Sequence, residues 1–351
     1  MGSPREHSRN RARRVVLWNF RAHERMSPRV PGLRIVRRPL KEPCCRLSGW
    51  CWSRINYLGL MTLLTVRHIT TYFYKQPVSF GQHRMMFRPR DSFDQKLLDA
   101  RLSITPEPSY LRWVHDAFGN CVAIADFPDR PSDELRFESN IWLDHAPSTG
   151  PDFQIEDFAR EYPFSYDPEE TPDLMAALTP QYPDPDQSLH NWLSRVVRKN
   201  ETTDTGQLLM TLTHAVREGF TYERRSEPGT RPPAVTVRLG RGSCRDLALL
   251  MIEALRSLGL AARFVTGYLN LRGCDGEEYR GGGSTHAWCE VYLPGAGWVE
   301  LDPTNGIIGN RDLIRVAVAR DPSQAVPLWG AYFGAANDFA GMAVEVRVRS
   351  E

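Results

Sequence analysis

The most constraining feature of the sequence is an amphipathic helix that begins on a cysteine, in the stretch GSCRDLALLMIEALRSLGL (242–260). Apolar residues recur along it at helical spacing, which predicts one buried face. Ser243 suits an N-cap, and Gly259 stands where a left-handed residue commonly ends a helix. Cys244 then lies in the first turn, where unpaired N–H groups and the helix dipole favour a thiolate. This position makes Cys244 a candidate nucleophile, although a single cysteine at a helix start is more often structural.

A second stretch, GGGSTHAWCEVYLPGAGWVELDPTNG (281–306), predicts a β-hairpin that carries a histidine and an aspartate. A thiol nucleophile needs a base to take its proton and an acceptor to orient that base. His286 and Asp302 supply these two groups, and we predict a triad with Cys244. A four-residue loop would place Asp302 opposite Cys289, roughly 10 Å along the strand from His286. We therefore expect a bulge or a splayed strand end to close the gap.

The order of the remaining patterns predicts an α+β protein. Residues 61–150 alternate and carry turn signals at about ten-residue intervals, which is typical of an antiparallel sandwich or small barrel. A linker rich in Pro, Asp and Glu, with short helical pieces, covers 151–185. Residues 186–351 then form a catalytic core with two helices, a loop leading to Cys244, the Cys244 helix and several strands. The strands are expected over 261–269, 286–293, 298–302 and the C-terminal tail.

Charge divides the chain at about Met61. Residues 1–60 hold thirteen Arg and one Lys against three Glu, whereas the rest holds 39 acidic and 30 basic residues. The basic segment has the composition of a nucleic-acid-binding or targeting arm. It lacks apolar periodicity, so we expect a disordered extension or a mis-assigned start. The acidic remainder argues against a nucleic-acid or anionic-membrane surface. No apolar run is long enough to span a bilayer. Seven cysteines without a C-x-x-C pair favour a reducing, cytoplasmic compartment.

Three stretches together resemble the transglutaminase-like superfamily: GSCRDLALLMIEALRSLGLAARFVTGYL, THAWCEVYLPGAGWVELDPTNG and RDPSQAVPLWGAYFG. HITTYFYKQPVSFGQHRMMFRPR is similar to the start of the N-terminal β domain of its bacterial members. The resemblance covers about residues 62–349. It implies a papain-like core after the β domain, with a Cys-His-Asp triad at Cys244, His286 and Asp302.

The expected activity is thiol-dependent acyl transfer on peptide or protein amides. Water as acceptor gives a peptidase or deamidase, and a lysine amine gives a transglutaminase. The Cys244 N–H is one expected oxyanion donor, and the sequence assigns no second donor. We expect no cofactor and no metal. Two alternatives stay open, a non-catalytic peptide-binding module on the same fold and a small-acyl transferase of the arylamine type. The oligomeric state is not predicted.

Overall fold

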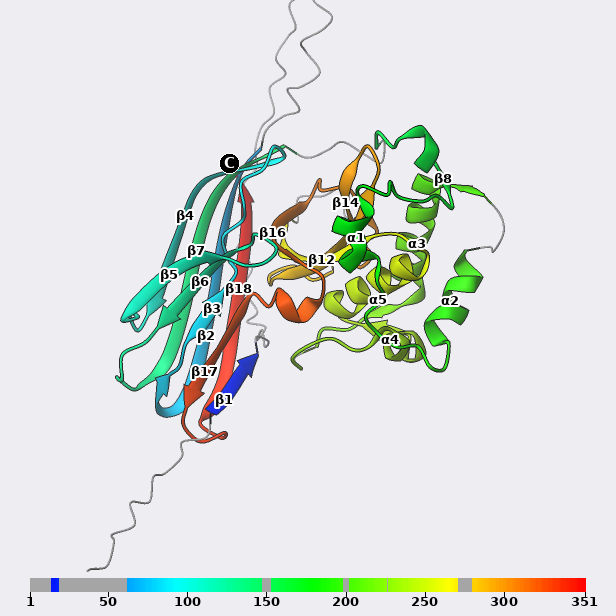
Figure 1. Cartoon of the computed structure of the whole chain (residues 1–351). Coiled ribbons are helices and arrows are strands. Elements are labelled where there is room, and N and C mark those ends of the chain that lie inside the picture. The colour runs from blue at the N-terminus through cyan, green and yellow to red at the C-terminus, as the bar shows by residue number, and fades with distance from the viewer. Residues whose placement is uncertain (1–13, 19–61, 147–152, 198–201, 226, 271–279) are drawn as a thin grey trace, which may run out of the picture.

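A computed structural model describes residues 14–18, 62–146, 153–197, 202–225, 227–270 and 280–351. A curled antiparallel sheet lies beside a second region, in which a smaller sheet stands between the large sheet and the helices (Figure 1). This arrangement confirms the predicted α+β class, with an N-terminal β domain ahead of the core. None of the helices in these ranges is long and apolar enough to cross a membrane.

The N-terminal sheet is built on one strand of 19 residues, β2 (Thr62–Phe80). The first part of β2 pairs with β7 and β18, and its end pairs with β17, so the sheet curls around an apolar interior. Tyr72, Phe137 and Tyr332 lie in that interior. The other strands of this sheet that precede the core are β3 (His83–Met85), β4 (Gln95–Thr105), β5 (Tyr110–His115), β6 (Cys121–Asp126) and β7 (Ser132–His145).

The end of the described chain returns to this sheet, in contrast to the predicted boundary of the core at 186–351. Strand β17 (Leu328–Phe333) pairs with β2 and β3, and β18 (Phe339–Ser350) pairs with β2 from Leu64 to Tyr74. The alternation of the tail indicates a strand but carries no information about which sheet it joins. The tail joins this sheet because it pairs with a free edge of β2, which lies far away in the sequence.

Part of the basic N-terminal segment also joins the sheet. Residues Arg14–Trp18 form β1, which pairs with β17. This strand differs from the structureless extension that we expected for 1–60. Residues 1–13 and 19–60 lie outside the described residues.

The core sheet has the order β15-β14-β13-β12-β16 and is antiparallel throughout. Its strands are β12 (Ala262–Leu269), β13 (His286–Leu293), β14 (Gly297–Asp302), β15 (Ile307–Ile308) and β16 (Leu313–Ala319). The bounds of β12, β13 and β14 agree with the predicted strands within one residue, whereas β15 and β16 were not predicted. The long helix α5 (Cys244–Ser257) packs against β12 and β13.

Four other helices and several two-residue strands complete the core. The helices are α1 (Thr171–Leu178), α2 (Ser188–Val196), α3 (Thr205–Gly219) and α4 (Pro233–Leu239). The short strands are β8 (Glu161–Tyr162), β9 (Thr203–Asp204), β10 (Thr221–Tyr222) and β11 (Arg241–Gly242). Two 3₁₀ helices cover Asp157–Ala159 and Pro322–Gln324.

Helix α4 was predicted as part of a loop. Prolines at the helix start and Gly240, in the left-handed conformation at its end, delimit it.

The core sheet is buried on both faces. Apolar side chains of α5 cover one face, and the N-terminal sheet covers part of the other through Leu64, Val66 and Ile141. These residues contact Tyr268 and Ile314 of the core sheet. The β domain therefore packs against the sheet that carries His286 and Asp302 and supports it.

Candidate active site

Cys244 occupies the first position of α5, as predicted. Ser243 is the N-cap and forms a capping box with Asp246, whose Oδ2 accepts from the Ser243 backbone N–H at 2.9 Å. The Cys244 N–H donates to no described residue, in keeping with its place among the orphan donors of a helix start. Its side chain is 8% exposed. The thiol is therefore enclosed, next to a free N–H donor.

Asp246 also holds the loop that precedes α4. Its Oδ1 accepts from the Arg231 backbone N–H at 2.7 Å, and its Oδ2 lies 3.2 Å from Nε of Arg225. Both members of the Asp246–Arg225 ion pair are buried. This carboxylate fixes the approach of the chain to Cys244.

His286 and Asp302 form a buried pair, with 2.7 Å between His286 Nε2 and Asp302 Oδ2. Asp302 is held by two further bonds. Its Oδ1 accepts from the Thr304 N–H at 2.9 Å, and its Oδ2 accepts from the Asn305 amide at 2.8 Å. The carboxylate is thus fully bonded and points at the imidazole.

The hairpin register brings the pair together without the bulge that we expected. Leu293 pairs with Gly297, and Cys289 pairs with Leu301. The loop therefore has three residues, because Gly295 and Gly297 adopt the left-handed conformation with φ of 84° and 72°. Asp302 follows Leu301 and so comes opposite Trp288, on the same face as His286. The predicted loop was one residue too long. Shortening it by one residue moves Asp302 from the face that carries Cys289 to the face that carries His286.

Charge interactions set the protonation of the pair. Burial lowers the pKa of His286, but the Asp302 carboxylate and the neighbouring Cys244 outweigh burial and raise it to about 10. Burial raises the pKa of Asp302, but His286 and the hydrogen bonds to the carboxylate bring it below its usual value. The geometry therefore favours an imidazolium beside a carboxylate. His286 Nδ1 has no hydrogen-bond partner among the described residues and remains available to the thiol.

Trp288 encloses the imidazole on one side. The ring is fully buried and stacks on His286 with centroids 5.9 Å apart and planes inclined by 27°. Gly267 makes room for it, because a Cβ at that position would lie 2.7 Å from Trp288 Cη2. Trp288 thus both packs in the interior and covers one side of the site.

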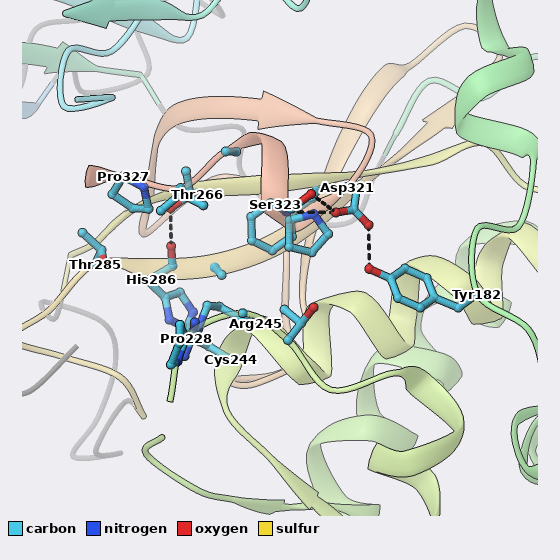
Figure 2. A pocket seen from close by; sticks show the side chains of 17 residues that line it. Tyr182, Pro228, Cys244, Arg245, Thr266, Thr285, His286, Asp321, Ser323 and Pro327 are labelled. Atoms are coloured by element: carbon cyan, nitrogen blue, oxygen red, sulfur yellow. Dashed lines mark hydrogen bonds between the residues drawn. The ribbon is translucent and has the colours of Figure 1, made fainter. Parts of the chain in front are cut away.

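A cavity of about 140 Å³ opens beside Cys244 and His286 (Figure 2). Its wall is mostly apolar, with Phe264, Ala287 and Val326, and Arg245 lies near Cys244. At its far end the Tyr182 hydroxyl donates to Asp321 at 2.7 Å. The cavity is large enough for an apolar side chain next to the sulfur.

Sequence reasoning missed the part of this wall that lies between β16 and β17, residues 321–327. RDPSQAVPLWG contains it and was quoted for the resemblance, but no feature of that stretch marked it as a cavity wall. The segment 276–284, which precedes β13, falls partly outside the described residues. Its described part includes Gly281, beside His286.

Comparison with known proteins agrees with this architecture. Residues 64–144 match the model of the bacterial transglutaminase-like N-terminal region, and residues 191–303, which include Cys244, His286 and Asp302, match that of the transglutaminase-like superfamily. An uncharacterized protein of Mycobacterium tuberculosis is 28% identical over 303 residues, which cover 80% of this chain and 91% of that protein. Another, from Mycobacterium leprae, is 35% identical over 106 residues, covering 30% of this chain and 37% of its own length.

A solved structure shows the same fold. A candidate cysteine protease from Cytophaga hutchinsonii superposes with a TM-score of 0.60 at 19% identity, over 83% of this chain and 91% of the other. The two family models match consecutive parts of this chain, and the likeness in fold extends over both. The protein therefore belongs to the transglutaminase-like superfamily and carries the N-terminal region of its bacterial members.

Proposed function

We propose that the protein is a cysteine enzyme that transfers acyl groups from peptide or protein amides through Cys244, His286 and Asp302. One observation carries the proposal. A buried His286–Asp302 pair lies beside a cysteine at the N-terminus of a helix, and Cys244 and His286 line a cavity. These are the parts that thiol catalysis requires, in the order nucleophile, base and orienting acid.

The proposed reaction has two halves. The Cys244 thiol gives its proton to His286, and the sulfur adds to the amide carbonyl carbon while the π electron pair moves to oxygen. The C–N bond then breaks, the carbonyl reforms, and the leaving amine takes the proton from His286. In the second half an acceptor loses a proton to His286 and displaces the sulfur. Asp302 keeps the imidazole oriented and stabilises its protonated form.

The acceptor decides between hydrolysis and transamidation. Water would make the protein a peptidase or deamidase, and a lysine amine would make it a transglutaminase. Incorporation of a fluorescent amine into casein, measured beside ammonia and peptide release, distinguishes these outcomes. A non-catalytic peptide-binding module remains the alternative, and none of these products would form in that case. The cytoplasmic location remains a prediction.

Alkylation by iodoacetamide across pH tests the nucleophile. We expect Cys244 to react at pH 6 well before Cys289, because Cys289 is buried and burial raises the pKa of its thiol. Cys244→Ala should remove the fast reaction, and His286→Ala should slow it. Cys289→Ala is the matched control and should leave it unchanged. If Cys244 reacts no faster than Cys289, or if His286→Ala has no effect, the proposal is wrong.

A further inference from the structure

Tyr222 is placed beside the start of α5 by a short parallel strand pair. Residue 222 in β10 pairs with Gly242 in β11, two residues before Cys244. The Glu223 N–H donates to the Gly242 carbonyl at 2.8 Å, which fixes the pairing just beyond Tyr222. The backbone that carries Tyr222 is therefore tied to the backbone that leads into Cys244.

The Tyr222 hydroxyl lies at the site itself. A Cβ built on Gly281 would be 2.9 Å from His286 Nδ1 and 3.6 Å from Tyr222 Oη, so the two polar atoms flank one point. Burial raises the pKa of Tyr222, and the charge of Cys244 raises it further, so the phenol stays protonated at neutral pH. Among the described residues, none accepts a hydrogen bond from its hydroxyl. A protonated donor without a partner thus faces the reacting groups.

The proposed reaction requires such a donor. When the Cys244 sulfur adds to a carbonyl carbon, the π electron pair moves to the oxygen, and that oxyanion needs hydrogen bonds. The Cys244 N–H supplies one of them. We propose that the Tyr222 hydroxyl donates the second hydrogen bond to this oxygen, which makes Tyr222 a catalytic residue. The hydroxyl keeps its proton throughout, and the bond is lost when the carbonyl reforms and the amine leaves.

This inference rests on the proposed function, because an oxyanion forms only if Cys244 attacks a carbonyl. Two reagents that modify the same sulfur separate the two claims. Iodoacetamide reacts by displacement at a saturated carbon and forms no oxyanion. p-Nitrophenyl acetate acetylates the sulfur through a tetrahedral oxyanion and releases nitrophenolate. The ratio of the two rates therefore reports on oxyanion stabilisation alone.

The experiment compares wild type, Tyr222→Phe and Tyr162→Phe in the full chain. We expect Tyr222→Phe to slow acetylation of Cys244 by about 10²–10³-fold, the typical effect of losing one oxyanion donor, and to leave alkylation within about twofold. Tyr162→Phe is the matched control, since its hydroxyl donates to the Leu258 carbonyl at 2.9 Å, at the other end of α5. It should change neither rate. Thermal unfolding of each variant checks that the fold is kept.

The outcomes distinguish the two proposals. If wild-type Cys244 is neither alkylated nor acetylated faster than Cys289, the proposed function fails. If wild type reacts with both reagents but Tyr222→Phe is acetylated at the wild-type rate, Tyr222 is not an oxyanion donor. An equal loss in both rates would also overturn the inference, because it would show an effect on the thiolate and not on the oxyanion.

Discussion

His286 and Asp302 are sixteen residues apart in sequence, and their side chains lie 2.7 Å apart on one face of a two-stranded hairpin. Both are fully buried, so water screens their interaction very little. The charge of Asp302 therefore governs the protonation of His286 more strongly than it would at the surface.

Replacing Asp302 by Asn tests this dependence. The amide has nearly the same shape but no charge, so the pKa of His286 should fall. The imidazole should then no longer keep its second proton near neutral pH. We expect acyl transfer to fall by about 10²–10⁴-fold, the range for loss of general acid–base catalysis. NMR titration of the imidazole gives the pKa directly. Asp338→Asn, in a turn before β18, is the control. An unchanged His286 titration in Asp302→Asn would contradict the expectation.

The same pair predicts how stability depends on pH. The pKa of His286 is about 10 in the folded protein and close to 6.5 for an ordinary histidine in the unfolded chain. The folded state thus binds the extra proton between these values, and its stability falls as pH rises. This contribution is fully present below about pH 6.5 and is lost through about pH 10. We expect Tm to fall more steeply over this interval in wild type than in His286→Gln. Parallel curves for the two proteins would show that His286 is not protonated.

The β13–β14 hairpin shows which features could be predicted from the sequence and which could not: the faces of the strands could, but the length of the loop could not. Alternation along the strand places His286 and Trp288 on one face, and the two rings stack in the structure. The loop length was ambiguous, because LPGAGW fits loops of three and of four residues. The positive φ of Gly297 decides it, and single-sequence patterns do not fix which glycine adopts that conformation.

Contacts between distant segments account for most of what the sequence did not show. Cys244, His286 and Asp302 each carry a local signal, at a helix start, a strand start and a strand end. Tyr222 carries none, because its role depends on a two-residue parallel pairing across twenty residues. The pairing of β18 with β2 joins segments that are far apart in the sequence and is equally invisible to local periodicity.

Gly281 offers a test of the enclosed space beside His286. A methyl group at this position would lie 2.9 Å from His286 Nδ1, which is too close for an unstrained contact. We therefore expect Gly281→Ala to slow both alkylation and acetylation of Cys244, by at least about tenfold. Gly283→Ala is a close control, because Gly283 also has a positive φ, of 76°, but a Cβ there would meet nothing within 4 Å. Equal losses in the two variants would attribute the effect to backbone strain alone.

The buried Asp246–Arg225 pair should hold the approach to Cys244. Removing one member of a buried ion pair leaves the other charge uncompensated and typically costs about 3–5 kcal/mol. We expect Asp246→Asn to lower the free energy of unfolding by an amount in this range, measured by urea denaturation. Asp204→Asn is the matched control. Asp204 caps α3, where its Oδ1 accepts from the Gln207 N–H at 2.8 Å, and Asn caps helices about as well as Asp.

A double variant separates the charge of Asp246 from its hydrogen bonds. Arg225→Met removes the buried guanidinium, so adding Asp246→Asn no longer strands a charge. If the ion pair accounts for the cost, the double variant should lose clearly less stability than the two single variants together. The remaining loss then belongs to the bonds that Asp246 accepts from the backbone N–H groups of Ser243 and Arg231 and from the Ser243 hydroxyl. Strict additivity would show that Asp246 acts only through these bonds, and that Arg225 contributes to the folded state by other contacts.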